Sequence, residues 1–380
     1  MWRPGARANA PDVLVIGAGV IGCSVAYHCA LAGLRVMVVE RDRIAAGASG
    51  AAAGMLAPQV EAHQPDHFFA FALAGRAEHA PLAERLRDEA DVDVECRRSG
   101  VLRIALEERE AVDLRGRTVW QQRQDLRAEW LEPPEVARLE PAYAGAAGKR
   151  LVGALWLPDE SQVFSPRLVR ALAVAAARRG VDFLEGTPVL AFETSATRIE
   201  GVHLPGATVT AGVVVLAAGA WSGGLCDRAG LHIPIEPIKG QIVALEALLR
   251  SPRHILWSGD CYVAPKVGGI LIVGATEERA GFDSRPTLSG LLQLATGATE
   301  LLPELGRLPV AAQWGGLRPA TPDRLPVIGW APGYDNLLLA TAHYRHGVLL
   351  GPLTGRLVAE LVQRQVLSWD ITPYSPARFA

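Results

Sequence analysis

The run GAGVIG at residues 17–22 has the spacing of a loop that holds a pyrophosphate. In such a loop Gly17 permits a tight turn, Gly19 lets phosphate oxygens approach the backbone, and Gly22 allows a helix to pack close to a strand. Glu40 follows Gly22 by 18 positions, where its carboxylate can accept hydrogen bonds from ribose hydroxyls and would repel a 2′-phosphate. The pattern predicts a site for FAD or NAD, and not for NADP.

The elements around residues 17–22 suit this role. Residues 12–16 form a continuous apolar run, typical of a strand with both faces covered, and apolar residues recur at helical spacing over 20–32. Residues 35–40 complete a strand–helix–strand unit of about thirty residues, in which the positive N-terminus of the helix faces the phosphates. This context makes the motif far more specific than its glycines alone.

The small-residue run GASGAAAG at residues 47–54 favours FAD over NAD. It has too few large side chains to build a core and is too apolar for a solvated linker, so another group must pack against it. A flat, buried isoalloxazine ring needs backbone close beside it, whereas a nicotinamide enzyme would not need such a run here. The alternative is a helix or loop packed tightly against another element.

Several motifs together resemble the glycine oxidases of the thiamine pathway, which belong to the D-amino-acid oxidase superfamily. The matching segments are GASGAAAGMLAP at 47–58, VVVLAAGAWS at 213–222, ILIVGAT at 270–276, GLRPATPDRLPVIG at 316–329 and ATAHYRHGVLLGP at 340–352. Taken in order, the resemblance covers nearly the whole chain from residue 11 to about residue 363.

The expected fold class is α/β combined with α+β. A Rossmann-like FAD-binding domain is interleaved with a substrate domain that is mainly an antiparallel sheet. The order of the predicted elements assigns residues 1–88, 151–226 and 314–380 to the FAD-binding domain, and 89–150 and 227–313 to the substrate-binding domain.

The resemblance also implies residues that hold a substrate carboxylate. Arg318, in the GLRP motif, matches the arginine that grips the carboxylate, and its planar guanidinium suits a bidentate contact. Tyr262 matches a substrate-side tyrosine that can donate its hydroxyl, and Arg345 is assigned to the same pocket. Asp260 stands where some members carry histidine, which puts the preferred amine in question. Without the resemblance, Arg318 would be interpreted as part of a salt bridge.

Contacts to a non-covalently bound FAD are implied at many positions along the chain. They are Gly17, Gly19, Val20, Ile21, Gly22, Glu40, Arg41, Ala48, Ser49, Ala53, Gly54, Met55, Val189, His343, Tyr344, Arg345, His346, Gly347, Val348 and Leu349. Three residues depart from the family pattern, because Ala48 replaces a frequent threonine, Ala342 a glycine and His346 an asparagine. We expect these departures to tune the site and not to abolish it.

The reaction implied by the resemblance is dehydrogenation of a small amino acid. The sequence contains no Ser-His-Asp order, no cysteine nucleophile and no second nucleotide-binding unit, so the substrate itself must reduce the flavin. Glycine, sarcosine or a small D-amino acid would give a hydride to the flavin without an obligatory general base. The imine would yield glyoxylate and ammonia or feed thiazole synthesis, and O2 would become H2O2. The resemblance also implies a homotetramer, with thiazole synthase as a further partner.

Three alternatives remain open from the sequence. The first is a flavin dehydrogenase of the same superfamily that oxidises D-amino acids or proline-like substrates and passes electrons to a quinone or carrier protein. The second, of another class, is a flavin-binding subunit with no turnover of its own. The third is an NAD-dependent dehydrogenase.

Composition excludes other classes of partner. Opposite charges nearly cancel, since 38 Lys and Arg against 40 Asp and Glu leave a net charge of −2, and no basic stripe indicates nucleic acid. Five cysteines without a CxxC pair argue against disulfides and zinc and favour a cytoplasmic location, and His63 and His67 are expected on a solvated surface. No apolar run reaches the roughly 18 residues of a membrane span, and residues 1–12 lack the apolar region of a signal peptide.

Overall fold

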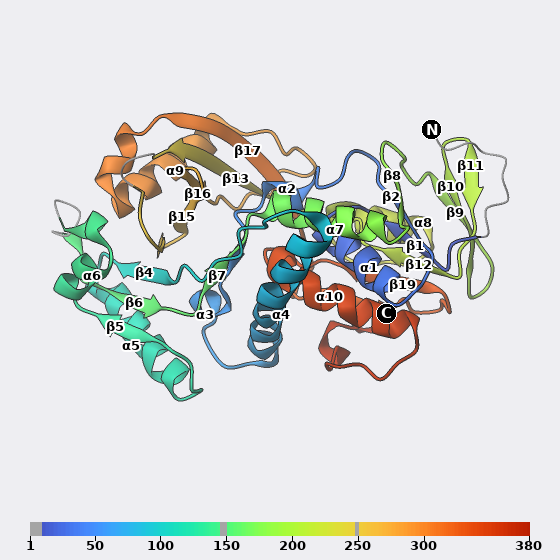
Figure 1. The fold of residues 1–380 in the computed structure, drawn as a ribbon, viewed down its shortest axis with the longest axis horizontal. Helices are drawn as coiled ribbons and strands as arrows, with labels where there is room; N and C mark the ends of the chain where they lie inside the picture. The colour runs from blue at the N-terminus through green and yellow to red at the C-terminus, as the bar shows by residue number, and fades with distance from the viewer. Residues whose placement is uncertain (1–9, 145–149, 248–250) are drawn as a thin grey trace.

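The computed structural model describes residues 10–144, 150–247 and 251–380. Residues 1–9 of the polar start, and 145–149 of the polar segment before residue 151, lie outside the described residues. Two large sheets lie along the long axis of the molecule, the six-stranded one toward the right of Figure 1 and the eight-stranded one toward the left. The fold class predicted from the sequence is confirmed.

The six-stranded sheet has the order β18-β19-β12-β1-β2-β8 and is parallel except at β18. Its strands are β1 Val13–Ile16, β2 Val36–Val39, β8 Asp182–Leu184, β12 Val213–Leu216, β18 Val327–Trp330 and β19 Leu337–Thr341. Val13 and Val15 face one apolar cluster, while Leu14 and Ile16 face another, because side chains alternate along a strand. Both faces are therefore covered, as the continuous apolar runs predicted.

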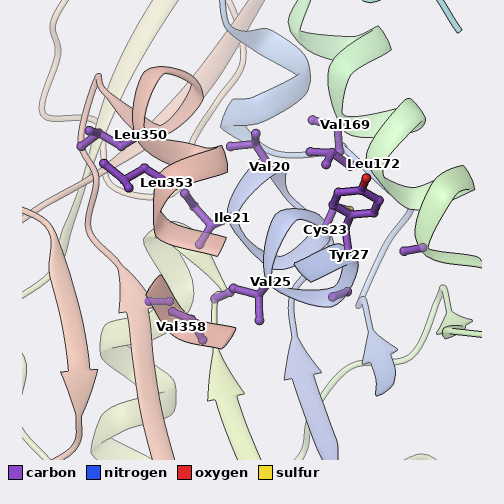
Figure 2. Packing of buried hydrophobic residues seen from close by; sticks show 14 of the residues in the cluster. Val20, Ile21, Cys23, Val25, Tyr27, Val169, Leu172, Leu350, Leu353 and Val358 are labelled. Atoms are coloured by element: carbon purple, nitrogen blue, oxygen red, sulfur yellow. The ribbon is translucent and has the colours of Figure 1, made fainter. Parts of the chain in front are cut away.

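Helices cover one face of this sheet, and a small sheet with a short helix covers the other. The helices are α1 Val20–Leu31, α4 His67–Ala90, α7 Ser165–Arg178 and α10 Gly347–Val362, and the small sheet is β9 Ala191–Thr194, β10 Ile199–Leu204 and β11 Ala207–Val209, beside α8 Ser222–Arg228. Figure 2 shows α1 between two of these helices: Val169 and Leu172 of α7 lie on one side, and Leu350 and Leu353 of α10 on the other. Since α1 is covered all round, its apolar residues are not confined to one stripe.

The eight-stranded sheet has the order β17-β13-β16-β15-β14-β4-β6-β5 and is antiparallel except between β14 and β4. Its strands are β4 Val101–Ala105, β5 Glu129–Leu131, β6 Gly153–Leu157, β13 Glu236–Glu246, β14 Ile255–Ser258, β15 Cys261–Lys266, β16 Ile270–Gly274 and β17 Val310–Ala320. Helices α5 Glu108–Gln122, α6 Pro133–Leu139 and α9 Leu288–Leu301 pack against it.

The remaining elements are short. They are α2 Ala48–Ala51, β3 Met55–Leu56, α3 Pro58–Glu61 and β7 Ser161–Gln162, together with the 3₁₀ helices η1 Pro141–Tyr143, η3 Gly219–Trp221, η4 Pro303–Arg307, η5 Thr372–Tyr374 and η6 Pro376–Phe379. Strands β3 and β7 pair antiparallel, which ties the segment after the small-residue run to the segment before α7.

Strand β6 lies just after the domain boundary predicted at residue 151, and strand β17 crosses the boundary predicted at residue 314. Strand β6 pairs with β4 and β5, and the whole of β17 pairs with β13, so both belong to the eight-stranded sheet. The local sequence of a strand does not specify which sheet the strand joins, so the boundaries could not be placed from it. We propose that the FAD-binding domain resumes after Leu157 and again after Ala320.

Other expectations concerned metals, thiols and membranes. Within the described ranges, no cluster of three His, Cys, Asp or Glu is arranged to bind a metal. His63 contacts Arg117 and His67 contacts Tyr374, so the two histidines have separate partners. All five cysteines are free thiols. No helix in the described part of the chain combines the length and apolarity needed to cross a membrane.

Three buried histidines predict a loss of stability in mild acid. Burial lowers the pKa of His28 and His343 to about 3 and that of His79 to about 4, so all three are neutral in the folded state. The unfolded chain takes up these protons below about pH 6.5, and stability therefore falls as the pH decreases toward the folded-state pKa values. Together they contribute a slope approaching about 4 kcal/mol per pH unit near pH 5.

Urea unfolding between pH 7 and pH 5 measures this slope. His28→Gln should remove about a third of the contribution of these three histidines, since each takes up one proton on unfolding. His232→Gln is the matched control, because the His232 side chain is 84% exposed. An equal slope in His28→Gln and the parent protein would contradict the assignment.

Candidate active site

A single cavity of about 1180 Å³ brings the predicted residues together. It extends from the loop after β1 to the face of β13, β15 and β17. Every residue that the sequence suggested for cofactor or substrate lines this cavity, with the exception of Gly22. Gly22 has a different role, because a Cβ added to it would lie 1.8 Å from the carbonyl oxygen of Gly17. It permits the close approach of α1 and β1, as the motif predicted.

The glycine loop has the conformation expected of a phosphate-binding turn. Gly17 has a φ of +105°, a region that residues with a side chain rarely adopt, and α1 begins immediately after Gly19 with its N-terminus at the cavity. The Ser49 hydroxyl accepts a hydrogen bond from the Val20 N–H at 2.9 Å. Ser49 thus stabilises the first turn of α1, and both Ser49 and Val20 line the cavity.

Glu40 is positioned by the backbone on both sides of it. One carboxylate oxygen accepts a hydrogen bond from the Ala18 N–H at 2.8 Å, and the other accepts from the Asp42 N–H at 3.0 Å. Each carboxylate oxygen has a further lone pair, so the side chain can still accept hydrogen bonds from ribose hydroxyls. The geometry fits the role predicted for Glu40.

Trp221 is a site residue that the sequence analysis did not select. It lines the cavity beside Arg41, whose guanidinium carbon lies 3.5 Å from the centroid of the Trp221 ring, and the Phe282 ring lies 5.5 Å away. Arg41 therefore makes a cation–π contact with Trp221, and both residues line the same cavity as Glu40. Trp221 belongs to the motif VVVLAAGAWS, and its place in that motif could have identified it as a site residue.

The small-residue run serves both of the purposes considered for it. Ala48, Ser49, Ala53, Gly54 and Met55 line the cavity, as the FAD interpretation requires. At the same time α2 packs closely on its neighbours: the Trp314 indole N–H donates to the Ala51 carbonyl oxygen at 3.0 Å, and the Ser165 hydroxyl donates to that of Ser49 at 2.6 Å. A small residue is required within the run, because a Cβ added to Gly54 would lie 2.1 Å from the carbonyl oxygen of Val163.

Arg318 and Tyr262 lie on the same face of the eight-stranded sheet, each held over a glycine. A Cβ on Gly240 would lie 2.2–2.5 Å from the Arg318 guanidinium, and one on Gly274 would lie 2.3 Å from the Tyr262 hydroxyl. Arg318 also donates to the carbonyl oxygen of Thr276 at 3.0 Å. The sequence analysis missed both glycines, although glycine inside a strand marks a close approach of another group.

The Tyr262 hydroxyl remains protonated around neutral pH. Burial raises the pKa of Tyr262 above its usual range, while the positive charge of Arg318 acts in the opposite direction and only partly offsets burial. A protonated phenol beside a guanidinium places two kinds of hydrogen-bond donor at one end of the cavity, which suits a carboxylate ligand.

Arg345 already has carboxylate partners within the protein. Its guanidinium forms ion pairs with Glu61 at 3.4 Å and with Glu277 at 3.2 Å. Burial acts to lower the pKa of Arg345, but Glu61, Tyr344 and Glu277 outweigh burial and raise it. The charge of Arg345 is therefore neutralised locally, which leaves Arg318 as the better candidate for the substrate carboxylate.

The segment from Ala342 to Leu349 closes the cavity at the start of α10. Ala342 has a φ of +56°, a left-handed conformation that explains why the resembling family often has glycine there. The His343 ring shares a hydrogen bond of 3.0 Å with the Thr354 hydroxyl, and burial lowers the pKa of His346, whose ring lies 3.9 Å from Glu61. The N-terminus of α10 adds a positive potential at this end of the cavity.

Gly240→Ala is expected to impair substrate binding without removing a functional group. The new methyl group must displace the Arg318 guanidinium, so we expect the KM for an amino-acid substrate to rise about tenfold or more, by loss of part of a charge-assisted contact. Steady-state kinetics measure this effect. Gly116→Ala on α5 is the control, because a Cβ there meets nothing within 4 Å; equal KM values for the two variants would contradict the packing argument.

The fold and the cavity define a dinucleotide-dependent oxidoreductase with a pocket suited to a carboxylate. The model of the family "FAD dependent oxidoreductase" matches residues 12–361, and the chain belongs to this family. Its cofactor is therefore FAD, which excludes the NAD-dependent dehydrogenase that the glycine loop alone allowed. The glycine loop, Glu40 and the cavity fit this cofactor.

Individual relatives are similar to this chain over almost its full length. The chain is 37% identical to a glycine oxidase of Geobacillus kaustophilus, with 97% of each chain covered. The crystal structure of a glycine oxidase from that species superposes with a TM-score of 0.93 at 35% identity, covering 97% of this chain and 99% of the other. A bifunctional protein ThiO/ThiG of Nostoc sp. is 34% identical over 93% of this chain and 53% of its own length.

Proposed function

We propose that this protein is an FAD-dependent glycine oxidase that also accepts sarcosine or small D-amino acids. The observation that carries the proposal is the convergence of Arg318 and Tyr262 in the cavity that the glycine loop and Glu40 also line. The relatives named glycine oxidase support the choice of substrate. Oxidation of glycine gives an imine, which hydrolyses to glyoxylate and ammonia, while O2 is reduced to H2O2.

The chain contributes binding and orientation. Arg318 and Tyr262 hold the substrate carboxylate, and holding it defines where the adjacent α-carbon and amine lie. FAD, when bound, accepts two electrons from the substrate and passes them to dioxygen. Positioning a small substrate against a reactive partner can supply much of a rate enhancement, so a general base is not required.

Anaerobic reduction of the flavin tests the proposal. Glycine mixed with the purified holoenzyme without oxygen should bleach the flavin absorbance, and sarcosine and D-alanine should do so at their own rates. If none of the three bleaches the flavin, the proposed function is wrong, and a flavin-binding subunit without turnover becomes the better interpretation.

A dehydrogenase that passes electrons to a quinone or carrier protein remains the second candidate. The structural basis for substrate binding would be the same, because Arg318 would hold the carboxylate in either case. Peroxide released stoichiometrically with substrate in air supports the oxidase. Rapid flavin reduction with slow reoxidation by air, accelerated by a quinone, would identify the dehydrogenase.

Location and assembly belong to the same proposal. We place the protein in the cytoplasm, which the five free cysteines favour. We expect a homotetramer. We also expect a functional link to thiazole synthase, which the bifunctional name of the Nostoc relative supports. Light scattering of the purified holoenzyme measures the assembly, and a mass of about one chain would contradict the tetramer.

A further inference from the structure

We propose that Arg103 is a second carboxylate-binding residue of the substrate pocket, so that the enzyme also binds amino acids that carry two carboxylates. The inference rests on the proposed function for the first carboxylate, which Arg318 holds. It adds a residue that neither the motifs nor the resemblance indicated.

Strand register places Arg103 on the same face as the substrate residues. Arg103 of β4 is opposite Trp257 of β14, Trp257 is opposite Tyr262 of β15, and Tyr262 is opposite Gly274 of β16. Residues directly opposite one another in neighbouring strands point to the same face of a sheet. Arg103 and Tyr262 therefore face the same cavity, and both line it.

Arg103 is a largely buried cation without a carboxylate partner among the described residues. Its guanidinium carbon lies 5.3 Å from the centroid of the Trp257 ring, a cation–π contact that leaves the nitrogens available. Other arginines of this region are paired: Arg117 contacts Asp113 at 2.8 Å, and Arg345 contacts Glu61 at 3.4 Å. A buried charge without a partner is unfavourable, so an anionic ligand would be stabilised there.

Burial lowers the pKa of Arg103 to about 10, with a further contribution from the positive charge of Arg117. The side chain is nevertheless protonated at neutral pH. Its positive charge is therefore present under the conditions in which a substrate carboxylate binds.

The acidic groups whose charges act on Arg103 come from three elements, and none of them forms an ion pair with it. Glu61 of α3 pairs with Arg345. Glu110 of α5 accepts hydrogen bonds from the Leu106 N–H at 2.9 Å and from the Glu107 N–H, which caps that helix. Asp260, in the turn between β14 and β15, lines the same cavity but is exposed to solvent and forms no ion pair with Arg103. A ligand carboxylate would therefore not have to displace a protein carboxylate from Arg103.

The positions of the two arginines suit a ligand that carries two carboxylates on separate arms. The Arg318 guanidinium lies over Gly240 of β13, and the Arg103 guanidinium lies near Trp257 of β14, three strands away. Three strand spacings are about 14 Å, too far for one carboxylate to bind both arginines. A secondary amine with two acetate arms carries two carboxylates, whereas glycine has only one.

Binding of unreactive analogues to the holoenzyme tests Arg103 independently of turnover. Thiodiacetate has two carboxylates and no oxidisable amine, and (methylthio)acetate lacks the second carboxylate. Perturbation of the flavin absorbance gives the Kd of each. We expect thiodiacetate to bind at least tenfold more tightly than (methylthio)acetate, and Arg103→Met to remove most of this ratio. Arg103→Lys should restore part of it, because a lysine retains the charge but not the bidentate geometry.

Arg109→Met is the matched control. Arg109 lines a smaller neighbouring cavity together with Arg103 but does not line the main one, so its loss should leave the ratio unchanged. Flavin content and the unfolding temperature of each variant report whether it is folded. The proposal is wrong if folded Arg103→Met retains the parent ratio of the two Kd values. It is also wrong if Arg103→Lys, Arg103→Met and Arg109→Met all lose this ratio to the same extent.

Kinetics with oxidisable substrates separate this proposal from the proposed function. For the parent protein, kcat/KM for iminodiacetate relative to sarcosine should exceed the same ratio in Arg103→Met at least tenfold. If glycine reduces the flavin but the kcat/KM ratio does not depend on Arg103, only the role of Arg103 is overturned. Arg103-dependent binding of thiodiacetate without flavin reduction by glycine supports the role of Arg103 and overturns the proposed function.

Discussion

Arg318→Ala should raise the KM for glycine by about two to three orders of magnitude. The guanidinium is the positive group best placed for the substrate carboxylate, since Arg345 is already paired with Glu61 and Glu277. Two charge-assisted hydrogen bonds together are worth about 3–4 kcal/mol, which corresponds to this change in KM. Binding of FAD should be retained, because the glycine loop and Glu40 lie at the other end of the cavity. Steady-state kinetics and the flavin absorbance measure both effects.

Two further variants make this result specific. Arg318→Lys should recover part of the loss, because a lysine keeps the charge without the planar fork. Arg285→Ala is the control, since Arg285 is 86% exposed and pairs with Asp283 outside the cavity. An unchanged KM in Arg318→Ala would exclude Arg318 from the substrate site.

Gly22→Ala should abolish FAD binding and strongly destabilise the protein. The new Cβ would overlap the Gly17 carbonyl oxygen at 1.8 Å and approach a methyl group of Val15 at 3.3 Å. The first of these contacts is with backbone, so α1 must move away from β1, and the phosphate-binding turn between them must distort. Such overpacking costs about 3 kcal/mol or more. The ratio of flavin to protein absorbance and urea unfolding measure the two losses.

The control for this variant is another glycine in a helix. Gly116→Ala on α5 places its Cβ in open space, and alanine is the better helix former, so stability should stay equal or rise by about 0.5–1 kcal/mol. Both variants add one methyl group to a helix. If Gly22→Ala binds FAD as well as Gly116→Ala does, the close approach of α1 and β1 is not what Gly22 provides.

The limits of sequence interpretation are visible in particular residues. The domain boundaries predicted at residues 151 and 314 leave β6 and part of β17 outside the eight-stranded sheet to which both strands pair. Arg345 was predicted to bind substrate and cofactor, and it lines the cavity, where it forms ion pairs with Glu61 and Glu277, residues 284 and 68 positions away in the chain. No pattern in one sequence indicates such a pairing, because it depends on how distant segments pack.

The sequence by itself determined the cofactor class and the core of the first domain. The glycine loop, α1 and Glu40 act within one strand–helix–strand unit, so their spacing along the chain is nearly their spacing in space. Tertiary structure alone decided what surrounds the substrate. The register of strands far apart in sequence brings Gly240 and Arg103 to the pocket and leaves room over Gly274 for the Tyr262 hydroxyl. Local spacing therefore predicts the nucleotide site, whereas strand pairing decides the shape and the charges of the substrate pocket.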